Sequence, residues 1–200
     1  SLDPKDKSIA VLAFADMSQE KNQEYFSDGI SAEIISLLGK IHELTVIDRR
    51  SSFSFKGKNA TTKQIGKELN VSHILDGSIR KYDDKVRIDV QLIDASDGSQ
   101  LWLETYDRKM DDIFKIQEDI AESVMSHLKI VLGTNKGIRI EQRPTTNIEA
   151  YRLYLQGLYY INLSGFSNIN NAISLLEKAI ELDPNFALAY AVLAKTYILN

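Results

Sequence analysis

Four basic side chains lie close together in the stretch RRSSFSFKGK, which contains no acidic residue. They are Arg49, Arg50, Lys56 and Lys58. Two phenylalanines alternate with hydroxyl residues in the same stretch, and cations beside aromatic faces can hold a phosphate, a nucleotide or a single strand. The stretch is therefore a candidate anion-binding loop. The alternative is a solvated loop whose phenylalanines enter the core. The P-loop pattern Gly-x-x-x-x-Gly-Lys is absent.

A second candidate is the polar side of three strands expected over 72–81, 86–92 and 100–109. If the alternation holds, one face carries Ser78, Arg80, Arg87, Asp89, Gln91, Trp102, Glu104 and Tyr106. Trp and Arg are typical of protein-binding hot spots. We therefore expect Arg80, Arg87, Trp102 and Tyr106 to form a protein-contact surface. The alternative is a solvent face with cross-strand ion pairs and Trp102 lying over the sheet.

Residues for catalysis or for binding a cofactor are not evident. The chain has no Cys, and its three His are far apart in sequence. Neither Gly-x-Ser-x-Gly nor Gly-x-Gly-x-x-Gly occurs. We expect no catalytic residue, no metal and no cofactor in this chain.

Composition limits the class of partner. The net charge of −4 over 200 residues does not favour nucleic acid as a partner. No apolar run approaches the roughly 18 residues that span a bilayer, so membrane attachment would need a segment outside this chain. The lack of Cys leaves the compartment open, periplasmic or cytoplasmic.

The pattern of apolar residues predicts two different domains. Residues 1–132 contain short apolar runs, helical stripes and alternating strands in the order β-α-β-α-β-β-β-α. We expect an α/β fold with a mixed sheet, and helices mainly on one face. Residues 133–146 have little periodicity and are predicted to be a linker. Residues 147–200 are predicted to be all helical.

The helical part carries the spacing of a tetratricopeptide (TPR) repeat. The second half of one repeat matches at Ala172, Leu176, Ala179 and Pro184, and the next first helix matches at Tyr190, Leu193, Ala194 and Tyr197. Gly157 and Tyr160 also fit, although Gln156 stands where Leu is usual. One full repeat and one further helix leave an apolar face uncovered. We therefore expect a part of a longer protein, with a possible homodimer through this exposed end.

Several motifs of the first domain together resemble the TolB amino-terminal-like domain, over roughly residues 7–132. They are IAVLAF from Ile9, YFSDGI from Tyr25, the 49–59 segment, ILDGSIR from Ile74, LWLETYDR from Leu101 and DIFKIQ from Asp112. Ala13 stands where relatives often have Pro. The resemblance implies no transferable catalytic residues. It also implies a bacterial multidomain protein in which TPR repeats follow and a class III nucleotide cyclase, a kinase or a winged helix often precedes.

We therefore expect a non-catalytic regulatory segment whose TPR surface binds a protein or peptide. One alternative is an accessory region of a class III adenylate or guanylate cyclase. A second is a nucleotide or small-ligand sensor that uses the basic loop.

Overall fold

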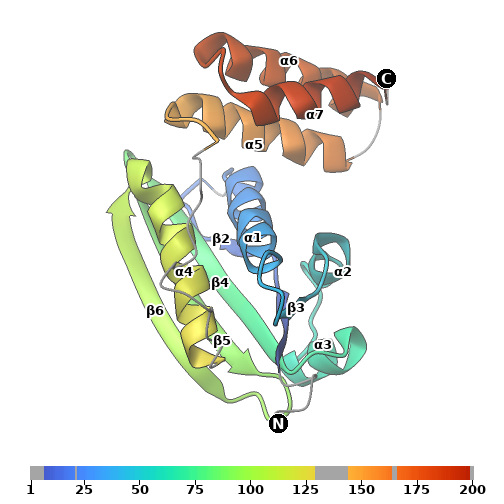
Figure 1. Ribbon diagram of the computed structural model, residues 1–200, viewed down its shortest axis with the longest axis vertical. Helices are drawn as coiled ribbons and strands as arrows, with labels where there is room; N and C mark the ends of the chain where they lie inside the picture. The colour runs from blue at the N-terminus through green and yellow to red at the C-terminus, as the bar shows by residue number, and fades with distance from the viewer. Residues whose placement is uncertain (1–6, 21, 129–143, 164–165, 199–200) are drawn as a thin grey trace. The chain divides into compact units, whose positions relative to one another are not determined.

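The computed structural model describes residues 7–20, 22–128, 144–163 and 166–198 (Figure 1). The chain divides into two compact units, Ser1–Ile140 and Glu141–Asn200. Each unit is described separately below. The predicted linker over 133–146 lies mostly outside the described residues.

The first unit is built on a mixed sheet, as the sequence predicted, but the sheet has six strands where the sequence predicted five. Its strands are β1 (Ser8–Val11), β2 (Ala15–Asp16), β3 (Thr45–Val46), β4 (His73–Tyr82), β5 (Lys85–Asp94) and β6 (Gln100–Lys109). The main order is β3-β1-β4-β5-β6, and β2 pairs with β4 beyond the end of β1. β1 is parallel to both β3 and β4, whereas β4, β5 and β6 form an antiparallel meander.

Four helices accompany the sheet: α1 (Glu24–Leu38), α2 (Arg49–Phe53), α3 (Thr62–Leu69) and α4 (Ile113–His127). A single 3-10 turn, η2 (Met110–Asp112), leads into α4. α1 and α4 pack against each other over one face of the sheet, where they lie in front of the strands in Figure 1. α2 and α3 lie over the other face, next to β1 and β4. The helices thus cover both faces in part, and not mainly one.

The core under α2 and α3 shows how the two faces divide. Ala10 of β1 and Ile74 of β4 lie opposite each other and pack with Phe55 and Ile65. Their sequence neighbours in the same strands point to the α1 and α4 side, because successive residues of a strand face opposite ways. Burial of both faces explains why β1 reads as a continuous apolar run.

Local signals set the ends of several elements. Thr61 and Gln64 form a capping box at the start of α3. Asp83 adopts φ 53° in the two-residue turn between β4 and β5, and Gly98 adopts φ 80° in the next connection.

Two elements were not foreseen. Residues 49–53 were expected to be loop, but they form α2 because the side chain of Asp48 accepts a hydrogen bond from the backbone N–H of Ser51. β2 was not expected, since two residues carry no alternating pattern.

The second unit consists of α5 (Ile148–Leu163), α6 (Phe166–Leu182) and α7 (Ala187–Ile198). α5 and α6 approach closely at Gly157, where a Cβ atom would stand 2.9 Å from Leu176 Cγ. Ala172, Leu176 and Ala179 are buried on α6. Small residues at the crossing and one large residue between them pack the helices as a hairpin.

The close packing at Gly77 of β4 gives a test of the sheet. A Cβ atom there would stand 2.6 Å from the carbonyl oxygen of Asp89 and 3.3 Å from the ring of Phe14. Because the first neighbour is backbone, we expect Gly77→Ala to lower the free energy of unfolding by about 1–3 kcal/mol. Chemical denaturation monitored by circular dichroism measures it.

Gly39→Ala is the matched control. Gly39 has an ordinary helical φ of −63°, so this change should alter the free energy of unfolding by less than about 1 kcal/mol. Equal effects of the two substitutions would contradict the assignment of the close contact.

Candidate functional site

The uncovered part of the sheet is a continuous polar face on β4, β5 and β6. Cross-strand register places Arg80 opposite Arg87, which lies opposite Asp107. Asp89 lies opposite Thr105, and the Thr105 hydroxyl donates to Asp89 Oδ1 at 2.5 Å. Residues that are directly opposite share a face. We call this surface the open face and define it by Arg80, Tyr82, Arg87, Asp89, Leu103, Thr105 and Asp107.

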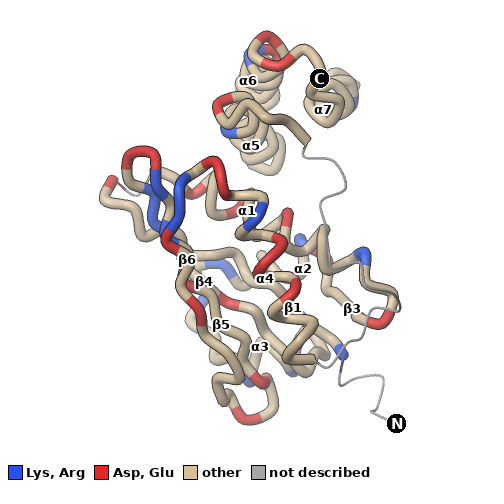
Figure 2. Tube along the Cα trace, turned by 60° about the vertical axis from the view of Figure 1, so that its left-hand side comes forward, with Lys and Arg blue, Asp and Glu red and all other residues tan. Residues whose placement is uncertain are grey.

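The charges on the open face are mixed and partly paired. Arg87 Nε lies 3.7 Å from Asp89 Oδ1, and Arg87 Nη1 lies 3.9 Å from Asp107 Oδ2. The Tyr82 hydroxyl donates to Asp107 Oδ1 at 2.7 Å. Figure 2 shows basic and acidic residues side by side along these strands. These exposed pairs hold their side chains in the plane of the surface and add little stability.

The prediction that Trp102 and Tyr106 share this face with Arg80 and Arg87 is wrong. Tyr106 lies opposite Ile88 and Trp102 lies opposite Leu92, so both point to the side covered by α4. The Trp102 ring lies 5.7 Å from the ring of His127 on α4. Only Arg80 and Arg87 of the four predicted contact residues belong to the open face.

Burial explains the position of Tyr106. Its side chain is 4% exposed and touches Glu104 and Ser123. Desolvation raises the pKa of the Tyr106 phenol to about 12, with a contribution from the charge of Glu104. The aromatic ring therefore serves as core beneath α4, with its hydroxyl at the edge of the sheet.

Leu103, Thr105 and Asp107 replace the aromatic residues on the open face, and sequence reasoning missed them. Leu103 is 56% exposed and lies among polar residues of the open face. The signal was available in β5, whose buried residues must share a face with their partners in β6. Residue type alone, without the pairing of β5 with β6, placed the alternate residues of β6 on the wrong faces of the sheet.

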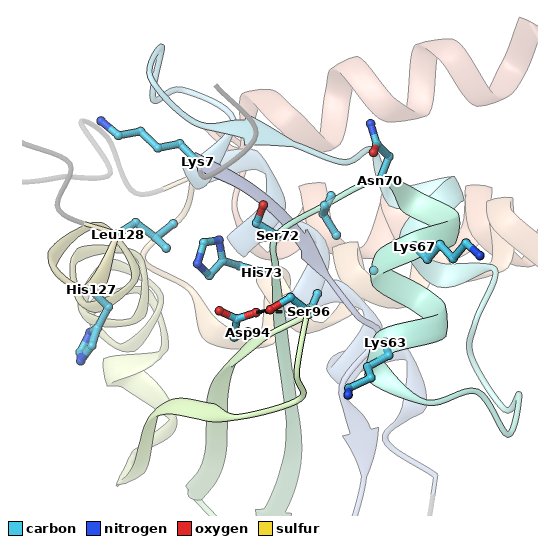
Figure 3. A pocket seen from close by; sticks show the side chains of 13 residues that line it. Lys7, Lys63, Lys67, Asn70, Ser72, His73, Asp94, Ser96, His127 and Leu128 are labelled. Carbon is cyan, nitrogen blue, oxygen red and sulfur yellow. Dashed lines mark hydrogen bonds between the residues drawn. The ribbon is translucent and has the colours of Figure 1, made fainter. Parts of the chain in front are cut away.

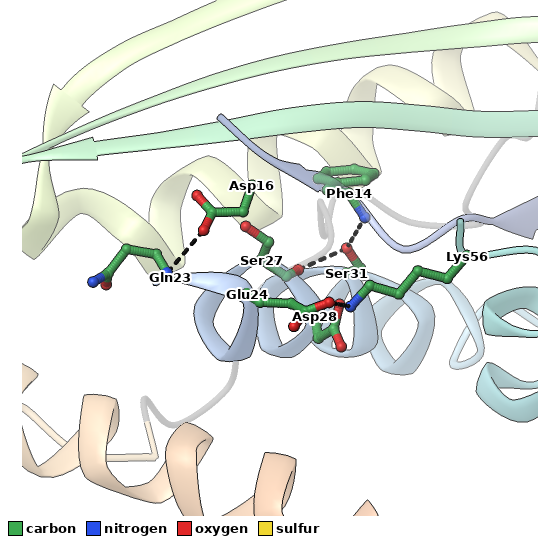
Figure 4. Close-up of polar contacts among 8 residues, drawn as sticks. All are labelled: Phe14, Asp16, Gln23, Glu24, Ser27, Asp28, Ser31 and Lys56. Carbon is green, nitrogen blue, oxygen red and sulfur yellow. Dashed lines mark hydrogen bonds and ion pairs between the residues drawn. The ribbon is translucent and has the colours of Figure 1, made fainter. Parts of the chain in front are cut away.

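The predicted anion-binding loop contains one strongly engaged cation. Lys56 Nζ lies 2.6 Å from Asp28 Oδ1 and 2.7 Å from Glu24 Oε1 on α1 (Figure 4). The Asp28 side chain is 9% exposed, against 32% for Lys56. Burial raises the pKa of Asp28, and the hydrogen bond and charge of Lys56 oppose that rise. Two carboxylates thus take up the charge of Lys56.

The other basic residues of the loop lie over aromatic rings or in solvent. Arg49 lies 5.0 Å from the centroid of Phe53, and the Lys58 ammonium lies 5.4 Å from that of Phe55. Arg50 is in the last turn of α2. The four cations do not form one cluster, and binding of an anion by this loop stays a prediction.

The loop after β1 is attached to α1 by a second polar contact. The backbone N–H of Phe14 donates to Ser31 Oγ at 3.0 Å, and Ser31 donates to the carbonyl of Ser27 at 2.8 Å (Figure 4). Asp16 accepts from the backbone N–H of Gln23 at 2.8 Å, just before α1 begins. The side chains of Ser31 and Asp16 thereby fix the segment after β1 against α1.

A hollow of about 710 Å³ lies at the amino ends of β1 and β4. Lys7, Lys63 and Lys67 line it together with His73 and Asp94. Figure 3 shows the three lysine side chains pointing in different directions. The Asp94 carboxylate already accepts from the backbone N–H and the hydroxyl of Ser96. This hollow presents no convergent group of ligands.

The residues of the predicted TPR spacing divide between core and surface of the second unit. Gly157, Ala172, Leu176 and Ala179 are buried, and Pro184 follows the end of α6. Tyr160 and Leu193 are half-buried. Tyr190, Ala194 and Tyr197 are exposed on α7, and the Tyr197 hydroxyl donates to Glu177 Oε1 at 2.7 Å. α7 thus presents apolar and aromatic side chains to solvent.

The described residues offer neither a cluster of metal ligands nor a membrane span. They contain no group of three or more His, Cys, Asp or Glu placed to hold a metal ion. None of their helices combines the length and the apolar character needed to cross a membrane.

Comparison in sequence gives one informative relative. A protein of Rhizobium meliloti (strain 1021) named "Putative adenylate cyclase 3" is 37% identical over 191 residues. The match covers 96% of this chain and 32% of the relative, so the chain spans about a third of that protein's length. No protein-family model matches the sequence.

Comparison with solved structures gives distant likenesses. TolB from Acinetobacter baumannii is 13% identical with a TM-score of 0.45, covering 63% of this chain and 29% of that one. Lipoprotein GNA1162 from Neisseria meningitidis is 16% identical with a TM-score of 0.43, covering 52% and 80%. The LpoB C-terminal domain from Escherichia coli is 10% identical with a TM-score of 0.42, covering 55% and 87%. Likenesses of this size say nothing about what this chain binds.

The Lys56 contacts give a prediction about pH. Lys56→Met should lower the free energy of unfolding at pH 7 by about 1–3 kcal/mol, because it leaves the carboxylate of Asp28 buried without its cation. It should also raise the pKa of Asp28 further. The penalty should therefore shrink as the pH falls through that pKa, where the protonated carboxyl favours the folded state. Urea denaturation at several pH values measures this.

Lys58→Met is the matched control in the same loop. Lys58 contacts a ring and makes no ion pair among the described residues, so its loss should cost less than about 1 kcal/mol. A pH-independent loss in Lys56→Met would show that Lys56 stabilises the protein by packing alone.

Proposed function

We propose that this chain is a non-catalytic, partner-binding segment of a longer bacterial regulatory protein. The observation that carries the proposal is the open face, where an exposed Leu103 lies among fixed ionic and hydroxyl groups. An exposed apolar side chain with a polar rim is the usual composition of a protein-binding surface. Arg80 and Arg87, two of the predicted contact residues, supply the cations of that rim.

The chemistry of the first unit supports a binding role over a catalytic one. The ionic contacts of Lys56 join α1 to the loop before α3 and engage the carboxylates of Asp28 and Glu24. The buried hydroxyls of Ser27 and Ser52 have no hydrogen-bond partner among the described residues, so no base is hydrogen-bonded to either of them. A nucleophile without a base is not activated.

In the same proposal, the second unit belongs to a longer TPR array and supplies a second contact surface. Leu188 and Tyr190 on α7 are 46% and 48% exposed. A helix that is apolar on more than one side packs against two neighbours. In a longer array, the outer side of α7 would meet the next helix, and the concave side would bind a protein or peptide.

A more specific proposal is that the chain is an accessory region of a nucleotide cyclase. The relative named as an adenylate cyclase is about three times as long as the matched region, which leaves room for a separate catalytic domain. In this proposal, partner binding to the open face changes the activity of that domain. The sensor alternative, in which the basic loop binds a nucleotide, has less support because Lys56 is paired with two carboxylates.

The open face gives the test of partner binding. A photo-crosslinker placed at position 103 should capture a partner from the bacterium, and the purified partner should then bind the wild-type chain. Leu103→Asp and Arg87→Glu should each weaken that affinity by about tenfold or more, as expected for contact residues. Lys63→Glu, outside the open face, should leave it unchanged. Equal affinity for all variants would exclude the open face as the contact surface.

The cyclase proposal is tested separately. The purified chain with ATP and Mg²⁺ should form no cyclic AMP, whereas the full-length protein should. Leu103→Asp in the full-length protein should change the response to the partner and leave the basal rate unaltered. Turnover by the isolated chain would contradict the non-catalytic proposal.

A further inference from the structure

A second hollow, of about 760 Å³, lies at the carboxyl end of β1. One side is formed by the segment after β1, which includes Leu12 and Phe14, and by Glu24 at the start of α1. The other side is formed by the connection between α2 and α3, which includes Lys58. Asp76 of β4 closes it toward the sheet. The hollow therefore joins segments that are far apart in sequence.

The strand order makes this position distinctive. β1 lies between β3 and β4, and it is parallel to both. The chain passes from β1 to β3 through α1 on one face, and from β3 to β4 through α2 and α3 on the other. β1 is thus a topological switch point, where the crevice outside the carboxyl ends of the strands is a preferred ligand site in open α/β sheets.

Most charged groups around the hollow are already satisfied by the protein. Lys56 bridges Asp28 and Glu24 across the end of β1, as Figure 4 shows. The two carboxylate oxygens of Asp16 accept from the backbone N–H groups of Ser18 and Gln23. These groups build the wall and have no need of a ligand.

Lys58 and Asp76 differ from them. In the described part of the chain, Lys58 contacts the ring of Phe55 and makes no ion pair. Asp76 accepts from the backbone N–H of Gly77 and, at 3.4 Å, from Gln91 Nε2. A carboxylate has about four acceptor positions, so Asp76 keeps free capacity. Burial raises its pKa, which shows that these bonds do not offset its desolvation.

The rest of the lining is largely apolar. Leu12, Phe55, Ala60 and Ile65 form it, and Phe55 and Ile65 belong to the core under α3. A cavity with an apolar floor and a few separate polar groups is the usual form of a small-molecule site. Here the two polar groups with remaining capacity carry opposite charges.

We propose that this hollow binds a small zwitterion, such as an amino acid or a short peptide with an apolar side chain. Asp76 accepts the hydrogen bonds of the ammonium, Lys58 pairs with the carboxylate, and the apolar body lies on Phe55 and Ile65. The hollow adjoins the open face, because Asp76 lies opposite Gln91, which lies opposite Leu103. The proposal goes beyond the proposed partner binding, since a ligand can bind here without a protein partner.

Calorimetry with the purified 200-residue chain tests the site. The probes are L-leucine and L-leucyl-L-leucine, with 3-methylbutylamine and 4-methylpentanoate as analogues that keep only the amine or only the acid. We expect at least one zwitterion to bind with a Kd between about 1 μM and 1 mM. Each single-ended analogue should bind at least about tenfold more weakly, because one charged group of the site then stays unpaired.

Isosteric variants assign the two ends. Asp76→Asn should weaken zwitterion binding at least about tenfold and leave the affinity for 4-methylpentanoate unchanged. Lys58→Gln should also weaken zwitterion binding at least about tenfold, and it should leave the affinity for 3-methylbutylamine unchanged. Lys63→Gln is the control outside the hollow and should bind as the wild type does. Circular dichroism confirms that each variant is folded.

Three outcomes would overturn the proposal. They are no binding of either zwitterion, equal binding by the two variants and the wild type, and binding of the acid alone as tightly as the zwitterion. None of these outcomes bears on the open face, which is tested with a protein partner.

Discussion

The contact of Lys56 with Asp28 and Glu24 joins the two layers of the first unit. α1 lies on one face of the sheet and the α2–α3 connection on the other, and Lys56 provides a route between them beside the carboxyl end of β1. Lys56 spans that route with two short ionic contacts. Because β1 is four residues long, its end is close to the core, and a link at this point fixes both helical layers relative to the strands.

The same link determines the shape of the hollow. With Lys56 held on α1, the residues that follow it pass over the carboxyl end of β1 and place Lys58 beside Phe55. Gly57 in this segment has a φ of 73°, a value that glycine adopts readily and that lets the chain turn here. As a glycine, it also places no side chain in the crevice. In one loop, Lys56 therefore forms the structural ion pairs and Lys58 is the residue proposed to bind the ligand.

The two sides of the sheet differ in burial: one carries the core, and the other carries the candidate contact surface. β1 and β4 are covered on both faces where they pair, and they carry the core. β5 and β6 are covered by α4 on one face and present the open face on the other. An antiparallel meander tolerates a solvated face, whereas the parallel part of the sheet does not. The candidate contact surface thus lies on the half of the sheet that the core can leave uncovered.

The sequence by itself determined the elements whose signals are local. The mixed α/β class, the strand over 100–109, the turn at Asp83 and the cap at Thr61 follow from periodicity, turn residues and hydrogen-bonding side chains within a few positions. The short helix α2 was not predicted, because five residues are too few to show a helical periodicity. The hairpin packing around Gly157 also conforms to a spacing that can be counted along the chain.

Only the tertiary structure decided which side chains meet. The pairing of β5 with β6 placed Trp102 and Tyr106 under α4 and Leu103 on the open face, and a change of one residue in register would have reversed this. Lys56 and Asp28 are 28 positions apart, and no local rule brings them together. Which distant segments contact each other depends on the order of the strands in the sheet. That order buries apolar area over the whole domain and is not set by any one segment.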